Sequence, residues 1–292
     1  MPFLSIHDLS FRLPDGRTLF SGLDLSFGSE RTGLVGRNGV GKSSLLSILD
    51  GETPPASGTL RRDGRIVRMR QMLEPAPDET VADLFGVGGA LALLARIEAG
   101  RAATDEIAGA DWTLEPRVDK ALADVGLRGV SPLRPLSTLS GGQRVRAALA
   151  ALSFAEPDLV LMDEPSNDLD REGRAMLHGF LDGWKAGAVV VSHDRALLNR
   201  MDRIVELSPD GARVYGGGFD AYHERKTAER EAAGKALDAA EREARQAARG
   251  AQQARERQAR RDSVARRGRA THVPGERGRT HQRRDGARAA PL

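Results

Sequence analysis

A glycine-rich loop that ends in a lysine and a serine carries the most evident chemistry in this chain. Residues 36–43 read Gly-Arg-Asn-Gly-Val-Gly-Lys-Ser, which fits G-x-x-x-x-G-K-S. The glycines let backbone N–H groups turn inward around phosphate oxygens, and the helix expected next points its positive end at them. Lys42 supplies a cation for the β- and γ-phosphates, and the Ser43 hydroxyl is a ligand for Mg²⁺. The residues expected to surround the phosphates are Gly36, Arg37, Asn38, Gly39, Val40, Gly41, Lys42, Ser43 and Ser44.

Two adjacent carboxylates follow an apolar run, Leu-Val-Leu-Met-Asp-Glu at residues 159–164. On its own, such a pair is usually only the polar end of a strand. Beside a phosphate loop it has a second interpretation: Asp163 would hold Mg²⁺, and Glu164 would orient and deprotonate an attacking water. The chemistry expected of these residues is cleavage of the terminal phosphate of a bound nucleotide.

Two further segments indicate a family. Residues 139–143 read Leu-Ser-Gly-Gly-Gln, and residues 191–195 read Val-Ser-His-Asp-Arg. In this order with the phosphate loop and the carboxylate pair, they resemble the ATP-binding cassette (ABC) family. The resemblance implies an ATPase that uses ATP and Mg²⁺.

The resemblance also implies roles for single residues. His193 would contact the γ-phosphate. Together with Lys42 and Glu164, it is one of the three expected catalytic residues. A lone histidine after a strand is more often structural, and the role of His193 therefore depends on the family. Gln71, at the end of a predicted strand, would complete the metal site with Ser43 and Asp163. By itself a glutamine is uninformative.

The signature at residues 139–143 implies a partner. In the family, the residues of this motif open a helix whose positive end faces the γ-phosphate held by a second cassette. These residues are Leu139, Ser140, Gly141, Gly142 and Gln143. Each motif occurs once in the sequence, so we expect a second cassette, from a second copy or from a separate chain.

Three runs favour the ABC-F branch. Residues 164–170 read Glu-Pro-Ser-Asn-Asp-Leu-Asp, residues 192–198 read Ser-His-Asp-Arg-Ala-Leu-Leu, and residues 214–222 read Val-Tyr-Gly-Gly-Gly-Phe-Asp-Ala-Tyr. They resemble motifs of that branch, in which two cassettes are joined by a charged helical linker and no membrane domain is present. The resemblance implies a cytoplasmic factor that acts on the ribosome in translation or antibiotic resistance. The aromatic residue that stacks on adenine in the family falls at Leu13, and Phe11 is a candidate to replace it.

Apolar periodicity predicts the elements that position these motifs. Alternating apolar residues over 3–35 predict short strands with a turn at Asp15-Gly16, whereas residues from about 72 to 155 show helical spacing. Strands that alternate with helices predict an α/β fold of the P-loop NTPase type, with a mainly parallel sheet, a small antiparallel part and a helical insertion. We expect this cassette over residues 1–222.

The remaining residues are basic. From 223 to 292 the sequence has 19 Lys and Arg against 10 Asp and Glu. This segment therefore has a net charge of +9, whereas residues 1–222 have a net charge of −6. Residues 223–265 predict a charged helix, and glycine and proline predict a disordered tail over 266–292. Such a segment can meet RNA through its phosphates, or it can be only a solvated helix.

Composition excludes several classes of protein. The sequence has no cysteine, which excludes disulfides and thiolate metal sites, and no apolar run approaches the roughly 20 residues that cross a bilayer. Two alternatives to the ribosome factor stay open. One is the nucleotide-binding subunit of an ABC transporter that docks on a separate membrane protein, and the other is a binding module without activity of its own.

Overall fold

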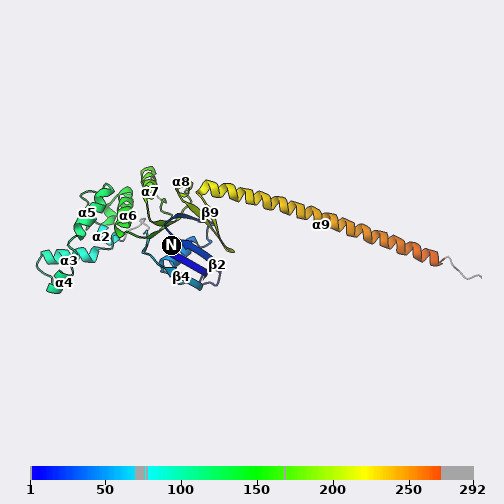
Figure 1. Ribbon diagram of the computed structural model, residues 1–292, viewed down its shortest axis with the longest axis horizontal. Helices are drawn as coiled ribbons and strands as arrows, with labels where there is room; N and C mark the ends of the chain where they lie inside the picture. The colour runs from blue at the N-terminus through cyan, green and yellow to red at the C-terminus, as the bar shows by residue number, and fades with distance from the viewer. Residues whose placement is uncertain (1, 70–75, 77, 168, 271–292) are drawn as a thin grey trace, which may run out of the picture. The chain divides into compact units, whose positions relative to one another are not determined.

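The computed structural model describes residues 2–69, 76, 78–167 and 169–270 (Figure 1). The chain divides into two units, Met1–Lys226 and Thr227–Leu292. Every strand within the described part belongs to the first unit, and the described part of the second unit belongs to one long helix, α9 (Phe219–Ala270). No helix among these described residues is both long and apolar enough to span a bilayer.

The first unit is built on a six-stranded sheet with the order β5-β6-β7-β3-β8-β9. Its strands are β3 (Arg31–Gly36), β5 (Ile66–Arg68), β6 (Leu159–Asp163), β7 (Gly187–Val191), β8 (Arg203–Ser208) and β9 (Gly211–Gly216). Strands β5, β6, β7, β3 and β8 are mutually parallel, and β9 pairs antiparallel with β8. The predicted mainly parallel sheet is confirmed.

A second, antiparallel sheet has the order β2-β1-β4. Its strands are β1 (Leu4–Arg12), β2 (Thr18–Phe27) and β4 (Ser57–Arg62). The turn between β1 and β2 falls at the predicted Asp15-Gly16, where Gly16 has a φ of 87° that favours glycine and its N–H donates to the Leu13 carbonyl at 2.9 Å. This hairpin lies before the glycine-rich loop in the sequence and forms one wall of the site described below.

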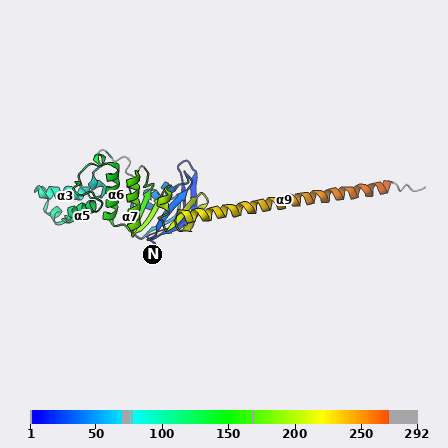
Figure 2. The same cartoon turned by 90° about the horizontal axis from the view of Figure 1, so that it is seen from above.

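Helices fill the remaining segments. They are α1 (Lys42–Asp50), α2 (Val81–Leu84), α3 (Gly88–Glu98), α4 (Thr104–Ala108), α5 (Leu114–Asp124), the 3₁₀ turn η1 (Leu136–Thr138), α6 (Gly141–Ala155), α7 (Arg171–Gly183) and α8 (Arg195–Leu198). Figures 1 and 2 both place α3 and α5 at the end of the unit opposite the antiparallel sheet, and Figure 1 shows α4 beside α3. The predicted helical insertion is therefore present, and its helices run from α2 to α6.

The parallel strands are buried on both faces, as their continuous apolar runs require. On one face, alternate residues such as Leu161 and Val189 pack with α1 and the antiparallel sheet. On the other face, residues such as Met162 and Val190 pack with α6, α7 and α8. A third apolar cluster joins α2, α3 and α5 to the far side of α6. The sheet is thus a rigid layer between two cores, and its strand ends hold the loops that follow them.

Helix α9 includes the predicted charged helix and runs without a break through residues 222 and 265. It also continues past Gly268, which we expected to end it. A single glycine costs about 1 kcal/mol relative to alanine in a helix. The neighbouring alanine and arginine residues have high helix propensity and offset this cost. The domain boundaries at 222 and 265 stay predictions. Residues 271–292 of the predicted tail, and Gln71, lie outside the described residues.

Two glycines give a matched test of the packing. A Cβ atom at Gly187, the first residue of β7, would lie 2.0 Å from the Gly28 carbonyl oxygen and 2.8 Å from Leu159 Cδ1. We expect Gly187→Ala to lower the free energy of unfolding by about 1–3 kcal/mol or more, because the backbone of β7 must move. Exposed Gly179 in α7 has no such neighbour within 4 Å. Gly179→Ala should therefore raise the free energy of unfolding by about 0.5–1 kcal/mol. Urea unfolding followed by circular dichroism measures both changes, and equal effects would contradict the packing described here.

Candidate functional site

The glycine-rich loop connects the end of β3 to the start of α1 and leaves backbone N–H groups free for a ligand. Gly39 and Gly41 have φ values of 77° and 104°, in the left-handed region. Gly41 is also the N-cap of α1, and no side chain caps this helix end. Because the first N–H groups of a helix lack intrahelical partners, this end can bind an anion.

The Lys42 side chain is buried, with 9% of the residue exposed. Its Nζ donates to the carbonyl oxygens of Gly36 and Arg37, at 3.0 and 3.4 Å. Both bonds stay within the loop, so backbone dipoles stabilise the lysine charge. Phosphate oxygens are better partners for an ammonium group than carbonyls are, and the loop is therefore suited to exchange one for the other.

Asp163 lies at the end of β6 and lines the same cavity as this loop. It is buried, and its Oδ2 lies 3.8 Å from Arg68 Nη2. Asp163 and the exposed Ser43 line the same cavity. A carboxylate and a hydroxyl are the hard oxygen donors that Mg²⁺ prefers, and Mg²⁺ often completes its shell with phosphates and water. Among the described residues no group of three or more acidic or histidine side chains could hold a metal ion by itself.

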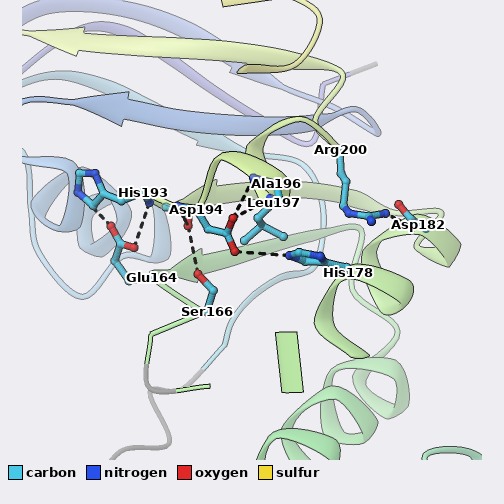
Figure 3. Close-up of polar contacts among 10 residues, drawn as sticks. Glu164, Ser166, His178, Asp182, His193, Asp194, Ala196, Leu197 and Arg200 are labelled. Atoms are coloured by element: carbon cyan, nitrogen blue, oxygen red, sulfur yellow. Dashed lines mark hydrogen bonds and ion pairs between the residues drawn. The ribbon is translucent and has the colours of Figure 1, made fainter. Parts of the chain in front are cut away.

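Glu164 has an unusual backbone that directs its side chain at His193. Its φ is 47°, in the left-handed region, and its N–H donates to the Val191 carbonyl at 2.8 Å. Its Oε2 accepts from the His193 N–H at 3.3 Å, and its Oε1 lies 3.3 Å from His193 Nε2 (Figure 3). Strained residues of this kind cost about 1–3 kcal/mol and concentrate at functional sites.

The environment of Glu164 suits a general base. Burial raises the pKa of its carboxyl above the ordinary value, whereas His193 and Lys42 act in the opposite direction and Asp163 adds to the increase. A raised pKa makes the carboxylate a better proton acceptor near neutral pH. Glu164 thus combines a fixed direction with increased basicity.

These residues line one cavity of about 420 Å³. The predicted residues that line it are Asn38, Gly39, Gly41, Lys42, Ser43, Ser44, Asp163, Glu164 and His193. Gly36 and Arg37 act through the carbonyls that hold Lys42, and Val40 is buried in the apolar core. The parts expected to bind phosphate, metal and water are therefore brought together by three strand ends.

The signature residues are in a different place. Ser140 caps α6: its Oγ accepts from the Gln143 N–H at 3.3 Å, and Gln143 Oε1 accepts from the Ser140 N–H at 3.0 Å. Ser140, Gly141, Gly142 and Gln143 line a second cavity, of about 440 Å³, with residues of α7. Leu139, 4% exposed, anchors the motif in the helical core. The signature does not reach the phosphate loop of its own chain.

Sequence reasoning missed three residues that line the first cavity, Arg17, Leu19 and Val191. The two predicted adenine contacts do not line this cavity in the described part of the chain. Phe11 stacks on Phe20, with 6.0 Å between ring centroids, and Leu13 packs against the same apolar core. Both side chains are partly buried, and the adenine contact stays a prediction. The position of Arg17 just after the turn Asp15-Gly16 was the only signal for it.

Comparison with known proteins agrees with this geometry. The family model described as "ABC transporter" matches residues 22–167. The "Tylosin resistance ATP-binding protein TlrC" of Streptomyces fradiae is 36% identical over 80% of this chain and 48% of its own length. The mouse (Mus musculus) "ATP-binding cassette sub-family F member 3" is 35% identical over 75% of this chain and 33% of its own length. The chain spans about half or less of the length of these relatives.

Solved structures support the fold. A dimeric ATP-binding cassette in a post-hydrolysis state, bound to ADP and phosphate, matches with a TM-score of 0.57 and 22% identity, covering 74% of this chain and 100% of the other. At this level of identity the similarity concerns the fold alone.

Arg17 gives a test of where the nucleotide base lies. We expect Arg17→Ala to weaken ATP binding about two- to fivefold, because a guanidinium plane can stack on a purine. Arg17→Lys keeps the charge without the plane and should not restore binding. Calorimetry with ATP and with inorganic triphosphate separates the two effects, since only ATP has the base. Phe11→Ala should leave ATP affinity unchanged once the folded fraction is taken into account; the reverse result would place the base on Phe11.

Glu164 gives a test of the general base. Glu164→Gln keeps the size of the side chain and one acceptor oxygen but cannot accept a proton, so we expect ATP to bind while turnover falls by about 10²–10⁴-fold. In the wild type, kcat should fall as the pH drops through the raised pKa of Glu164, since the protonated carboxyl is no longer a base. Glu164→Gln should lack this acid limb. Turnover close to that of the wild type would remove Glu164 from this role.

Proposed function

Because the chain belongs to the ATP-binding cassette family, with relatives in its F branch, we propose that it binds and hydrolyses ATP as a cytoplasmic factor acting on the ribosome. The observation that carries the ATPase part is the single cavity that combines Lys42, Asp163, Glu164 and His193. These are the groups that phosphoryl transfer to water requires: a cation, a metal ligand, a base and a γ-phosphate contact.

In the proposed reaction, the glycine-rich loop and the N-terminus of α1 bind the phosphates through backbone N–H groups. Lys42 exchanges its bonds to Gly36 and Arg37 for bonds to phosphate oxygens. Asp163 and Ser43 would hold Mg²⁺, which neutralises phosphate charge when it is bound. Glu164 accepts the proton of the attacking water, and His193, 3.3 Å from Glu164, is placed to orient the water and the γ-phosphate together.

We further propose that the signature residues serve the ATP of a second cassette. Ser140 and the N-terminus of α6 line a cavity apart from the chain's own phosphate loop, so they are available to another site. The dimeric cassette bound to ADP and phosphate shows that a protein of this fold can pair. Pairing would place the free N–H groups of α6 against a phosphate.

The ribosome part of the proposal is carried by α9. Its described residues include a series of exposed arginines, and one relative is named for tylosin resistance and another as an antibiotic resistance protein. Arginines along one helix bind nucleic-acid phosphates without reading base sequence. We propose that α9 contacts ribosomal or transfer RNA in this way.

Charge-neutralising changes in α9 test the RNA contact. Arg255, Arg257 and Arg260 are exposed. Replacing all three with Gln should weaken cosedimentation with ribosomes and lower the slope of log affinity against log salt, by up to about 0.9 for each phosphate that an arginine no longer neutralises. The matched triple change to Lys keeps the charge and should retain most of the slope. ATP affinity should be unchanged in both variants.

If the Gln variant binds ribosomes as tightly as the wild type at every salt concentration, these arginines are a solvated face. If the wild type itself does not sediment with ribosomes in the presence of ATP, the ribosome part of the proposal is wrong, while the ATPase part is tested separately by turnover.

A further inference from the structure

A histidine outside the nucleotide cavity faces the loop that carries His193. His178 lies in the middle of α7, and 15% of its side chain is exposed. Its Nε2 lies 3.6 Å from Asp194 Oδ2, and this nitrogen is buried without a hydrogen-bond partner among the described residues (Figure 3). A buried polar nitrogen left in this state costs about 1–3 kcal/mol, so its place beside a carboxylate calls for a physical explanation.

The two carboxylate oxygens of Asp194 face different partners. Oδ1 accepts from the N–H groups of Ala196 and Leu197, at 2.8 and 3.3 Å, and thereby caps α8. Oδ2 faces His178. The cap fixes one end of the carboxylate on α8, so a bond from α7 to the other oxygen would fix the loop from both sides.

The backbone around Asp194 connects it to the reacting groups. Its N–H donates to Ser192 Oγ at 3.0 Å, and Ser192 Oγ lies 3.4 Å from Ser166 Oγ, in the segment after Glu164. His193, the preceding residue, contacts Glu164 through both its N–H and its ring. A displacement of Asp194 therefore displaces His193 relative to Glu164.

We propose that His178 is a positioning residue for His193: its Nε2–H donates to Asp194 Oδ2 and holds the 192–194 loop in the geometry that hydrolysis needs. The 3.6 Å separation exceeds a normal N–H···O bond by less than 1 Å. A small shift of the loop toward α7 closes this bond, and it satisfies the one buried nitrogen of His178 that has no partner.

The inference rests on the proposed ATPase function and predicts a specific kinetic pattern. ATP is bound mainly by the glycine-rich loop and α1, which His178 does not touch. Loss of the His178 bond should therefore lower kcat and leave KM for ATP nearly unchanged, as expected for an interaction that matters in the transition state.

The experiment compares three variants of the full chain. His178→Leu removes the donor at similar volume, and we expect kcat to fall about five- to tenfold. His178→Gln can place an amide N–H near the position of Nε2 and should recover most of that loss. Asp182→Asn, one turn further along α7, weakens the ion pair with Arg200 and should leave kcat and KM unchanged. This control separates the role of His178 from general packing between α7 and the segment after α8.

A second readout does not depend on turnover. The chain has 6 histidines, so their ring nitrogens can be assigned in long-range ¹H–¹⁵N spectra. In His178→Leu the ring signals of His193 should shift, and in Asp182→Asn they should not. A wild-type kcat in His178→Leu, an equal loss in Asp182→Asn, or unshifted His193 signals would overturn the inference. A wild type that turns over no ATP, even at high protein concentration or with an added partner cassette, would contradict the proposed function, and the His193 signals would then decide the positioning role alone.

Discussion

The site depends on one constraint, the parallel register of β3, β7 and β6. Val191 is the partner of Leu34 on one side and of Asp163 on the other. Because the three strands are parallel and in register, their carboxyl ends meet at one edge of the sheet, and the segments that follow leave from the same place. The glycine-rich loop, Glu164 and His193 all lie within a few residues of these ends. A one-residue shift of β6 would turn Asp163 to the opposite face and separate the metal ligand from the base.

The charges and backbone dipoles at that edge of the sheet favour binding of a polyanion. Lys42 is buried and donates to two carbonyl oxygens of the loop, and the N-terminus of α1 has no side-chain cap. In the same cavity, the backbone of Glu164 has a left-handed conformation, its N–H donates to the Val191 carbonyl, and burial raises the pKa of its carboxyl. A phosphate chain would satisfy the first two groups, and the water at its end would meet the third. The strain and the unsatisfied groups are therefore concentrated at the positions where a ligand compensates for them.

The sequence predicted the parts of the site that follow strand ends and missed those that depend on side-chain packing. A strand with a glycine loop, or with two carboxylates, specifies its own geometry, so Lys42, Asp163 and Glu164 could be placed from motifs alone. Arg17 could not, because its place at the cavity depends on how the β1–β2 hairpin folds, and β1 has register shifts along its length. Phe11 was chosen by residue type; its ring packs on Phe20, and its contact with adenine stays a prediction. His178 gave no sequence signal, since its relation to Asp194 arises only when α7 lies beside the loop after β7.

Helix α7 lines the signature cavity and, further along, faces the loop that carries His193. Near its start Glu172 pairs with Arg146 of α6 at 2.7 Å, and this end of α7 lines the signature cavity. In its middle His178 faces Asp194, next to the residue that contacts Glu164. Helices in a packed core move as rigid bodies, so a shift of α6 that carries Ser140 must be accommodated by α7 or by the Arg146–Glu172 pair. Helix α7 thus contacts both α6, which begins at the signature, and the loop that carries His193. This shared attachment is the physical condition under which events at one nucleotide could alter the other.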